Sequence, residues 1–120
     1  MTTEPGYCVL VAEDEPLVTM LLEDLLSGVG YRVLVATRIA QALDMVAEHS
    51  VDVAILDIRL GQDHSFPLAD ECRRREIPFL FSSGHGSETL PARFQDTRML
   101  LKPYNMKTLI DALNALLATR

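Results

Sequence analysis

The chain has 120 residues, which is the length of one ordinary domain and too short for two independent cores. Hydrophobic residues make up 48% and charged residues 23%, as in folded globular proteins, which excludes a disordered or fibrous chain. Asp and Glu outnumber Lys and Arg by 17 to 11, and the resulting net charge of −6 opposes contact with nucleic-acid phosphates. No apolar run approaches the roughly 18 residues of a membrane span, and the acidic start at Glu4 lacks the basic region of a secretory signal. We therefore expect residues 1–120 to form one cytoplasmic domain, with no effector domain, membrane insertion or direct nucleic-acid contact.

Cys8 and Cys72 are the two cysteines of the sequence. They fall in a predicted strand and a predicted helix, without CxxC spacing or a matching histidine pattern, so we expect neither a disulfide nor a metal site there.

Short, uniformly apolar runs predict five strands. Because these runs do not alternate with polar residues, both faces of the sheet should be covered by helices, as is usual for parallel sheets. The runs are Cys8–Ala12, Val33–Ala36, Val53–Leu56, Phe79–Phe81 and Met99–Leu101.

Amphipathic segments between the runs predict four helices. The first begins at Pro16 and ends near Gly28. The others run from about Ile39 to Glu48, from about Pro67 to Arg75, and from Met106 onward after Asn105 as the N-cap. In the first helix, the stripe expected to face the sheet consists of Leu17, Leu21, Leu22, Leu25 and Val29.

The segment between Ser83 and Lys102 has a weaker helical pattern. Gly84, Gly86 and Pro91 interrupt it, so we expect at most a short turn beginning near Pro91.

Strict alternation of strands and helices predicts an α/β fold. The simplest form is a flavodoxin-like, doubly wound, five-stranded parallel sheet of order 2-1-3-4-5, with helices on both faces and a short or degenerate fourth helix. In such a sheet the ligand site lies beyond the carboxyl ends of the strands, near the switch point between strands one and three.

Polar side chains follow the strands at this edge. Glu13 and Asp14 follow the first strand, Asp57 the third, Ser83 the fourth and Lys102 the fifth. Three clustered carboxylates would raise one another's pKa unless a hard cation such as Mg²⁺ neutralised them. One carboxylate could then attack a phosphoryl group, with the lysine and the hydroxyl contacting the transferred oxygens.

Each of these residues also has a simpler interpretation. Asp14 or Glu15 could cap the first helix, Ser83 could belong to an ordinary turn, and Lys102 could be solvated. The convergence of four strand ends at one edge favours a site.

From Tyr7 to Leu117 the sequence closely resembles the receiver domain of bacterial two-component response regulators. The resemblance rests on four motifs, which occur in the family's order: Val9–Glu15 (VLVAEDE), Ile55–Asp57 (ILD), Ser83-Gly84 and Lys102-Pro103.

The resemblance implies a phosphoacceptor and a metal site. Asp57 matches the phosphoacceptor, Asp14 a direct Mg²⁺ ligand, Glu13 a ligand acting through water, and the main-chain carbonyl of Arg59 a further ligand.

The resemblance also implies a role for two residues at the phosphoryl group. Ser83 matches the switch hydroxyl and Lys102 the lysine that pairs with the phosphoryl group. On this view the Lys102 ammonium meets charge that arrives with the phosphoryl group, so Lys102→Ala is expected to leave the fold largely intact.

A narrower resemblance links the chain to the FAT GUY group of single-domain receivers, which is associated with general stress signalling in alphaproteobacteria. It rests on Pro78–Gly86 (PFLFSSGHG), Leu90-Pro91 and Lys102–Tyr104 (KPY). The chain departs from that group at Ser82-Ser83 and at His85.

Met99 stands where most receivers place a switching Tyr or Phe. Backbone with few helical hydrogen bonds opens readily and could be reordered by a bond between Ser83 and the phosphoryl group. We therefore expect residues 87–98, together with the Lys102–Tyr104 turn, to form the phosphorylation-sensitive partner surface.

The preferred hypothesis is a stand-alone receiver that is not an enzyme. It would accept a phosphoryl group from a histidine kinase or phosphotransferase onto Asp57 and signal through protein contacts. One alternative is a small phosphatase-like enzyme using Asp57 as nucleophile, which the lack of a lid disfavours. The other is a pseudo-receiver that binds partners constitutively.

Overall fold

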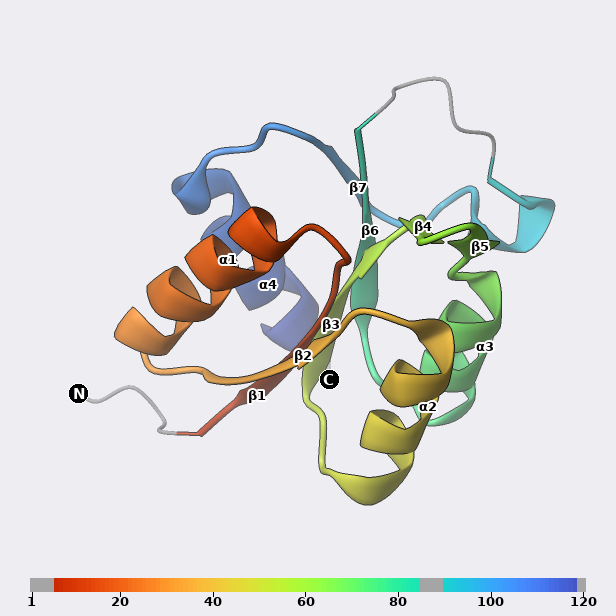
Figure 1. Ribbon diagram of the computed structural model, residues 1–120, viewed down its shortest axis with the longest axis horizontal. Helices are drawn as coiled ribbons and strands as arrows, with labels where there is room; N and C mark the ends of the chain where they lie inside the picture. The colour runs from red at the N-terminus through yellow and green to blue at the C-terminus, as the bar shows by residue number, and fades with distance from the viewer. Residues whose placement is uncertain (1–5, 85–89, 119–120) are drawn as a thin grey trace.

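The computed structural model describes residues 6–84 and 90–118 and is built around one twisted parallel sheet (Figure 1). The strand order is β2-β1-β3-β6-β7, which confirms the predicted order 2-1-3-4-5. Its strands are β1 (Cys8–Ala12), β2 (Arg32–Ala36), β3 (Val53–Asp57), β6 (Phe79–Ser83) and β7 (Met99–Leu101). A small antiparallel hairpin, β4 (Arg59–Leu60) and β5 (Asp63–His64), follows β3 and was not predicted.

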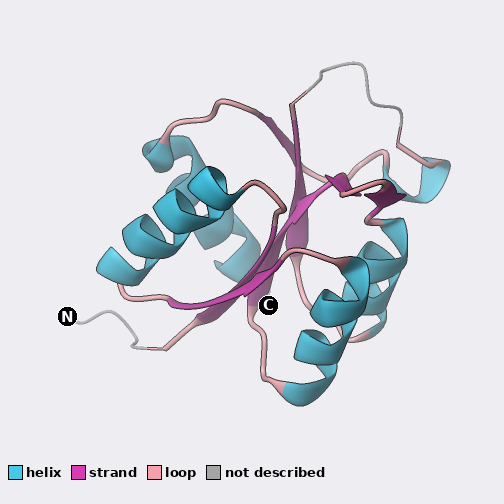
Figure 2. Ribbon diagram, viewed as in Figure 1, coloured by secondary structure: helices cyan, strands magenta, loops and turns pink. Residues whose placement is uncertain are grey.

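Helices cover both faces of the sheet (Figure 2). α1 (Pro16–Gly28) and α4 (Met106–Ala118) pack on one face, and α2 (Ile39–Glu48) and α3 (Phe66–Arg74) on the other. The amide of Thr108 donates to Asn105 Oδ1 at 2.8 Å, which confirms Asn105 as the N-cap of α4. In the described ranges, none of these helices combines the length and apolar character needed to cross a bilayer.

The connection from β6 to β7 contains one short 3₁₀ turn in its described part, η1 (Ala92–Phe94), which begins after Pro91 as expected. Phe94 is fully buried, and its ring centroid lies 5.4 Å from that of Phe81 and 5.9 Å from that of Phe66. Insertion of this one aromatic ring thus fixes the turn against α3 and the sheet.

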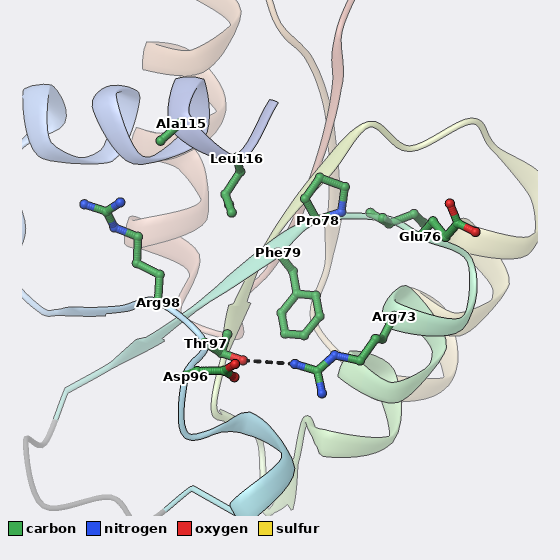
Figure 3. A pocket seen from close by; sticks show the side chains of 10 residues that line it. Arg73, Glu76, Pro78, Phe79, Asp96, Thr97, Arg98, Ala115 and Leu116 are labelled. Atoms are coloured by element: carbon green, nitrogen blue, oxygen red, sulfur yellow. Dashed lines mark hydrogen bonds between the residues drawn. The ribbon is translucent and has the colours of Figure 1, made fainter. Parts of the chain in front are cut away.

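Arg73 strengthens the same attachment. Its guanidinium lies 4.8 Å from the Phe94 ring centroid and donates to the carbonyl of Arg93 at 2.6 Å and to Thr97 Oγ1 at 3.3 Å (Figure 3). Arg73 thus ties α3 to the segment around η1. Beside it lies a hollow of about 680 Å³ that Pro78 and Leu116 help to line, at the amino ends of β6 and β7.

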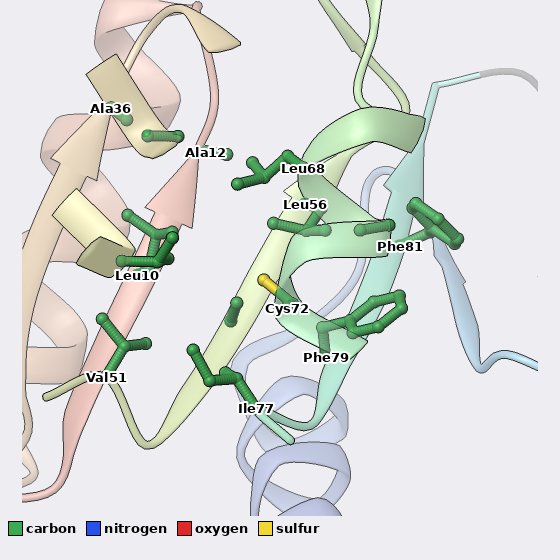
Figure 4. Packing of buried hydrophobic residues seen from close by; sticks show 14 of the residues in the cluster. Leu10, Ala12, Ala36, Val51, Leu56, Leu68, Cys72, Ile77, Phe79 and Phe81 are labelled. Carbon is green, nitrogen blue, oxygen red and sulfur yellow. The ribbon is translucent and has the colours of Figure 1, made fainter. Parts of the chain in front are cut away.

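The core follows from the alternation of side chains along the buried strands. In β1, Leu10 and Ala12 face the α2 and α3 side, whereas Val9 and Val11 face α1 and α4. Figure 4 shows the α2 and α3 side, where Leu68 and Cys72 of α3 pack over the strands.

The predicted inner stripe of α1 is confirmed at Leu22 and is wrong at its other four positions. Leu22 and Leu26 are buried, but Leu17, Leu21, Leu25 and Val29 are exposed. Apolar residues surround this helix on nearly every side, so their spacing alone did not identify the face that packs on the sheet.

Two leucine substitutions test the corrected stripe. Leu26→Ala removes a fully buried side chain and should lower the free energy of unfolding by about 2–5 kcal/mol. Leu21→Ala, at an exposed position of the same helix, should change it by less than about 0.5 kcal/mol. Urea titrations followed by circular dichroism measure both values, and equal losses would contradict the assignment.

Candidate functional site

The carboxyl edge of the sheet brings the predicted side chains together. The parallel register pairs Ala12 with Leu56, so Glu13 and Asp57 are the next residues on neighbouring strands. Carboxylate oxygens of Glu13, Asp14 and Asp57 lie within 4.8 Å of one another. On the other side, the amide of Lys102 donates to the carbonyl of Ser83 at 2.8 Å, which brings the last two strand ends to the same edge.

Lys102 joins two of the three carboxylates. Its Nζ lies 2.6 Å from Glu13 Oε1 and 3.0 Å from Asp57 Oδ2. Glu13 is only 2% exposed and the Lys102 side chain 19% exposed, so this bridge is largely shielded from water. The interpretation of Lys102 as a solvated lysine is therefore wrong.

The bridge sets the protonation of its members. Burial raises the pKa of the Glu13 carboxyl, and the hydrogen bond from Lys102 offsets part of that rise. Burial lowers the pKa of the Lys102 ammonium, but the hydrogen bonds to Glu13 and Asp57 and the negative charges of these carboxylates together outweigh burial, so its pKa lies above the usual value. Lys102 therefore remains a cation at neutral pH.

Asp14 occupies a different position from Glu13. It is exposed, and its Oδ2 accepts a hydrogen bond of 2.7 Å from the amide of Gly61 in the hairpin after β3. Asp14 therefore points toward the β3–α3 connection, whereas Glu13 points toward β7. Sequence reasoning missed both the hairpin and this bond, although the Gly61-Gln62 dipeptide is a two-residue hairpin signal.

The helix-cap interpretation of Glu15 fails. Glu15 is the N-cap residue of α1, but its side chain makes no capping hydrogen bond. Its amide instead donates to Glu13 Oε2 at 3.2 Å.

The remaining predicted residues differ in their surroundings. Ser83 is buried at the end of β6, and Arg59 opens the hairpin with its side chain exposed. Met99 is half-buried against the core on the α2 and α3 side. His85 lies outside the described residues.

A groove of about 480 Å³ adjoins Lys102 between α1 and the β7–α4 connection. Leu21 and Leu25 of α1 line one wall, and Tyr104 and Met106 line the other. A second molecule that reaches Lys102 from this side would therefore meet an apolar surface.

The fold and the site thus define a class of protein. It is a parallel α/β domain with clustered carboxylates and a lysine at the carboxyl edge of its sheet. A family model described as the response regulator receiver domain matches residues 9–114. The chain belongs to the response regulator receiver domain family. Receiver domains are signalling domains of two-component systems that accept phosphoryl groups from histidine kinases or phosphotransferases and bind Mg²⁺ at an acidic pocket.

Solved structures and curated relatives agree with this family. The solution structure of SdrG from Sphingomonas melonis Fr1 is 36% identical, with a TM-score of 0.80 over 97% of this chain and 99% of that chain. The BeF3-activated conformation of SdrG, from Pseudomonas melonis Fr1, is 34% identical, with a TM-score of 0.76 over 96% of this chain and 99% of that chain. The transcriptional regulatory protein CpxR of Klebsiella pneumoniae is 30% identical over 113 residues, which are 91% of this chain and 48% of CpxR. The chain therefore spans about half the length of the curated relatives it matches.

The bridge changes what we expect of Lys102→Ala. Lys102 already bridges Glu13 and Asp57 without a phosphoryl group, so its loss is expected to lower the stability of the fold as well as to affect phosphotransfer. Removing the Lys102 ammonium leaves a buried carboxylate without its cation, which should lower the free energy of unfolding by about 1–3 kcal/mol at neutral pH. Without the hydrogen bond from Lys102, the pKa of the buried Glu13 carboxyl rises further in the variant. The folded variant then binds the Glu13 proton more tightly than its unfolded state does. The deficit should therefore shrink as the pH falls from about 7 to about 5.

Urea unfolding of both proteins in metal-free buffer across this range measures the effect. Lys107→Ala, which removes only the exposed Lys107–Asp111 pair of α4, serves as the control and should have little effect at either pH. A deficit that does not change with pH would contradict the role given to Glu13.

Proposed function

We propose that the chain accepts a phosphoryl group on Asp57, with Mg²⁺, from a histidine kinase or histidine phosphotransferase, and that it signals through phosphorylation-dependent protein contacts. The observation that carries the proposal is the position of Asp57, which shares the Lys102 ammonium with Glu13 and lies within reach of Asp14. Carboxylates are covalent phosphoryl acceptors, and the transfer depends mainly on positioning and charge neutralisation.

The proposed step is a single displacement at phosphorus. A carboxylate oxygen of Asp57 forms the new P–O bond while the P–N bond of the donor phosphohistidine breaks, and the imidazole leaves with the bonding electron pair. Lys102 holds Asp57 through Oδ2 beforehand and can then contact an oxygen of the transferred group. The Ser83 hydroxyl is assigned to a second phosphoryl oxygen.

The donor set fits Mg²⁺, since its side-chain members are carboxylate oxygens. We assign Asp14 and Asp57 as direct ligands, together with the main-chain carbonyl of Arg59. Glu13 is assigned to act through water because its Oε1 is already bound to Lys102. When bound, the ion neutralises charge on the phosphoryl oxygens and the carboxylates.

Substitution of the acceptor tests the central assignment. Asp57→Asn replaces a nucleophilic carboxylate by an amide and should abolish Mg²⁺-dependent phosphorylation by acetyl phosphate. Intact mass spectrometry detects the added phosphoryl group, and Ser83→Ala serves as a control that retains the acceptor. Phosphate mapped to Ser83 in the wild type would overturn the assignment.

An exposed apolar surface on α1 supports a protein donor. Leu17, Met20 and Leu21 are 80%, 65% and 58% exposed, and Leu21 also lines the groove that reaches Lys102. We assign this α1 surface to an apolar helix of the phosphohistidine protein, flanked by basic residues that complement the exposed Glu23 and Asp24. A second copy of this chain would instead bring like charges together.

Leu21→Glu tests this surface, because Leu21 contributes little to the core. Transfer from a phosphorylated histidine phosphotransferase that is active on the wild type should slow at least about tenfold. Phosphorylation by acetyl phosphate should be unchanged. Asn114→Glu, at an exposed position of α4, controls for added charge. Equal slowing with both donors would place the effect at the site rather than at docking.

For output contacts we assign residues 90–98 and the Lys102–Tyr104 turn. The support is that residues 90–98 contain only one short 3₁₀ turn before β7, so few helical hydrogen bonds oppose a rearrangement. Residues 87–89 of the expected surface lie outside the described residues.

Amide hydrogen exchange tests the output surface. With Mg²⁺ and beryllofluoride as the phosphoryl mimic, protection over residues 90–98 should change in the wild type and stay unchanged in Asp57→Asn. Changes confined to the loop after Asp57 would contradict this assignment.

Assays on the same protein samples distinguish this proposal from the two alternative functions. A phosphatase-like enzyme would turn over a diffusible phosphate ester such as p-nitrophenyl phosphate, which we do not expect of a signalling domain. A constitutive pseudo-receiver would bind its partner equally with and without beryllofluoride.

Three further expectations belong to the proposal. Stand-alone action is supported by the match to 99% of the SdrG chain. A cytoplasmic location is supported by Cys8 and Cys72, which are both free and buried. Membership of the FAT GUY group, and with it a role in general stress signalling, remains a prediction from the sequence motifs.

A further inference from the structure

The hairpin after Asp57 is a built element rather than a loose loop. Arg59 pairs with His64 and Leu60 with Asp63, which leaves a two-residue turn of Gly61 and Gln62. Gly61 has φ of 62°, which places glycine at the first central position, as in a type II′ hairpin turn.

Three contacts fix the base of this hairpin. Leu60 is 2% exposed within the hydrophobic core. The amide of Ser65 donates to the carbonyl of Ile58 at 2.7 Å, and the His64 ring stacks on Phe66 with centroids 5.1 Å apart. The position of the tip is therefore determined by the core and not by solvent.

The tip is directed at Asp14. The Gly61 amide donates to Asp14 Oδ2 at 2.7 Å, across 47 positions of sequence. An exposed aspartate without such a partner samples several rotamers, whereas this bond selects one. With Oδ2 held by the hairpin, Oδ1 is the oxygen available to a cation at the carboxylate cluster.

We infer that the Gly61 main-chain amide is a positioning group for the metal site, holding Asp14 in the orientation that Mg²⁺ requires. The inference rests on the metal assignment of the proposed function. Metal-bound carboxylates are commonly oriented by hydrogen bonds from outside the ligand set, and loss of such a partner typically weakens metal binding about 10–100-fold. Gly61 is not itself a ligand, and this role follows from the hairpin geometry.

Two substitutions at Gly61 distinguish the effect of backbone conformation from the effect of side-chain size. A Cβ added at Gly61 meets no atom within 4 Å, so a side chain affects this site through φ and not through a clash. Asparagine tolerates positive φ and should keep the Mg²⁺ dissociation constant within about threefold. Valine does not tolerate it and should raise the constant about tenfold or more.

Isothermal titration with Mg²⁺ alone gives these constants, and thermal unfolding without metal gives the stability of each variant. Gly30→Val is the matched control, since Gly30 also has positive φ, at 103°, but lies beyond the end of α1. It should lower stability without changing Mg²⁺ affinity. If Gly30→Val weakened Mg²⁺ binding as much as Gly61→Val did, the inference would be overturned.

Exchange of the Gly61 amide provides a second test that does not depend on the folding of a Gly61 variant. In the wild type this amide should be protected, Asp14→Ala should remove the protection, and Mg²⁺ should increase it in the wild type. Faster exchange with Mg²⁺ would mean that the ion competes for Oδ2, which overturns the inference. If the wild type binds no Mg²⁺, the metal assignment and this inference both fail. Binding that is insensitive to Gly61→Val defeats the inference alone.

Discussion

The Glu13 carboxylate lies almost entirely out of water, and its environment must supply a cation or a proton. Lys102 supplies the cation and contacts Asp57 with the same ammonium. Because Lys102 follows β7 while Glu13 follows β1, this interaction draws the edge strand toward the centre of the site. The amide of Glu15 completes the arrangement by donating to Glu13 Oε2, which also ties the start of α1 to the cluster. The geometry around Asp57 thus depends on one buried carboxylate being satisfied from two directions.

The segment before β7 is held by side chains where its backbone makes little regular structure. Phe94 enters an aromatic cluster with Phe66 and Phe81, Arg73 covers its ring, and Arg93 forms a two-point pair with Asp70 of α3. One buried ring and two arginines therefore fasten the short turn η1 to α3.

The sequence predicted the strands and their order well because parallel strands buried on both faces are uniformly apolar and easily recognised. It failed on α1, where exposed Leu17 and Leu21 repeat with the same spacing as buried Leu22 and Leu26. The hairpin was missed because two-residue strands carry almost no periodicity. The edge that gathers the polar residues was predictable from topology, but the pairing of Lys102 with Glu13 was not, since it depends on burial and on contacts 89 positions apart.

β7 lies at the edge of the sheet and has only three residues. An edge strand presents unpaired backbone groups that can recruit a strand from another chain, and this hazard grows with the length of the exposed edge. Here the edge is brief, and the exposed Arg98 directly before it disfavours pairing with the same edge of a like-charged neighbour. The domain can therefore offer little template for intermolecular sheet growth or aggregation, although the described residues 90–98 before β7 form only a short 3₁₀ turn.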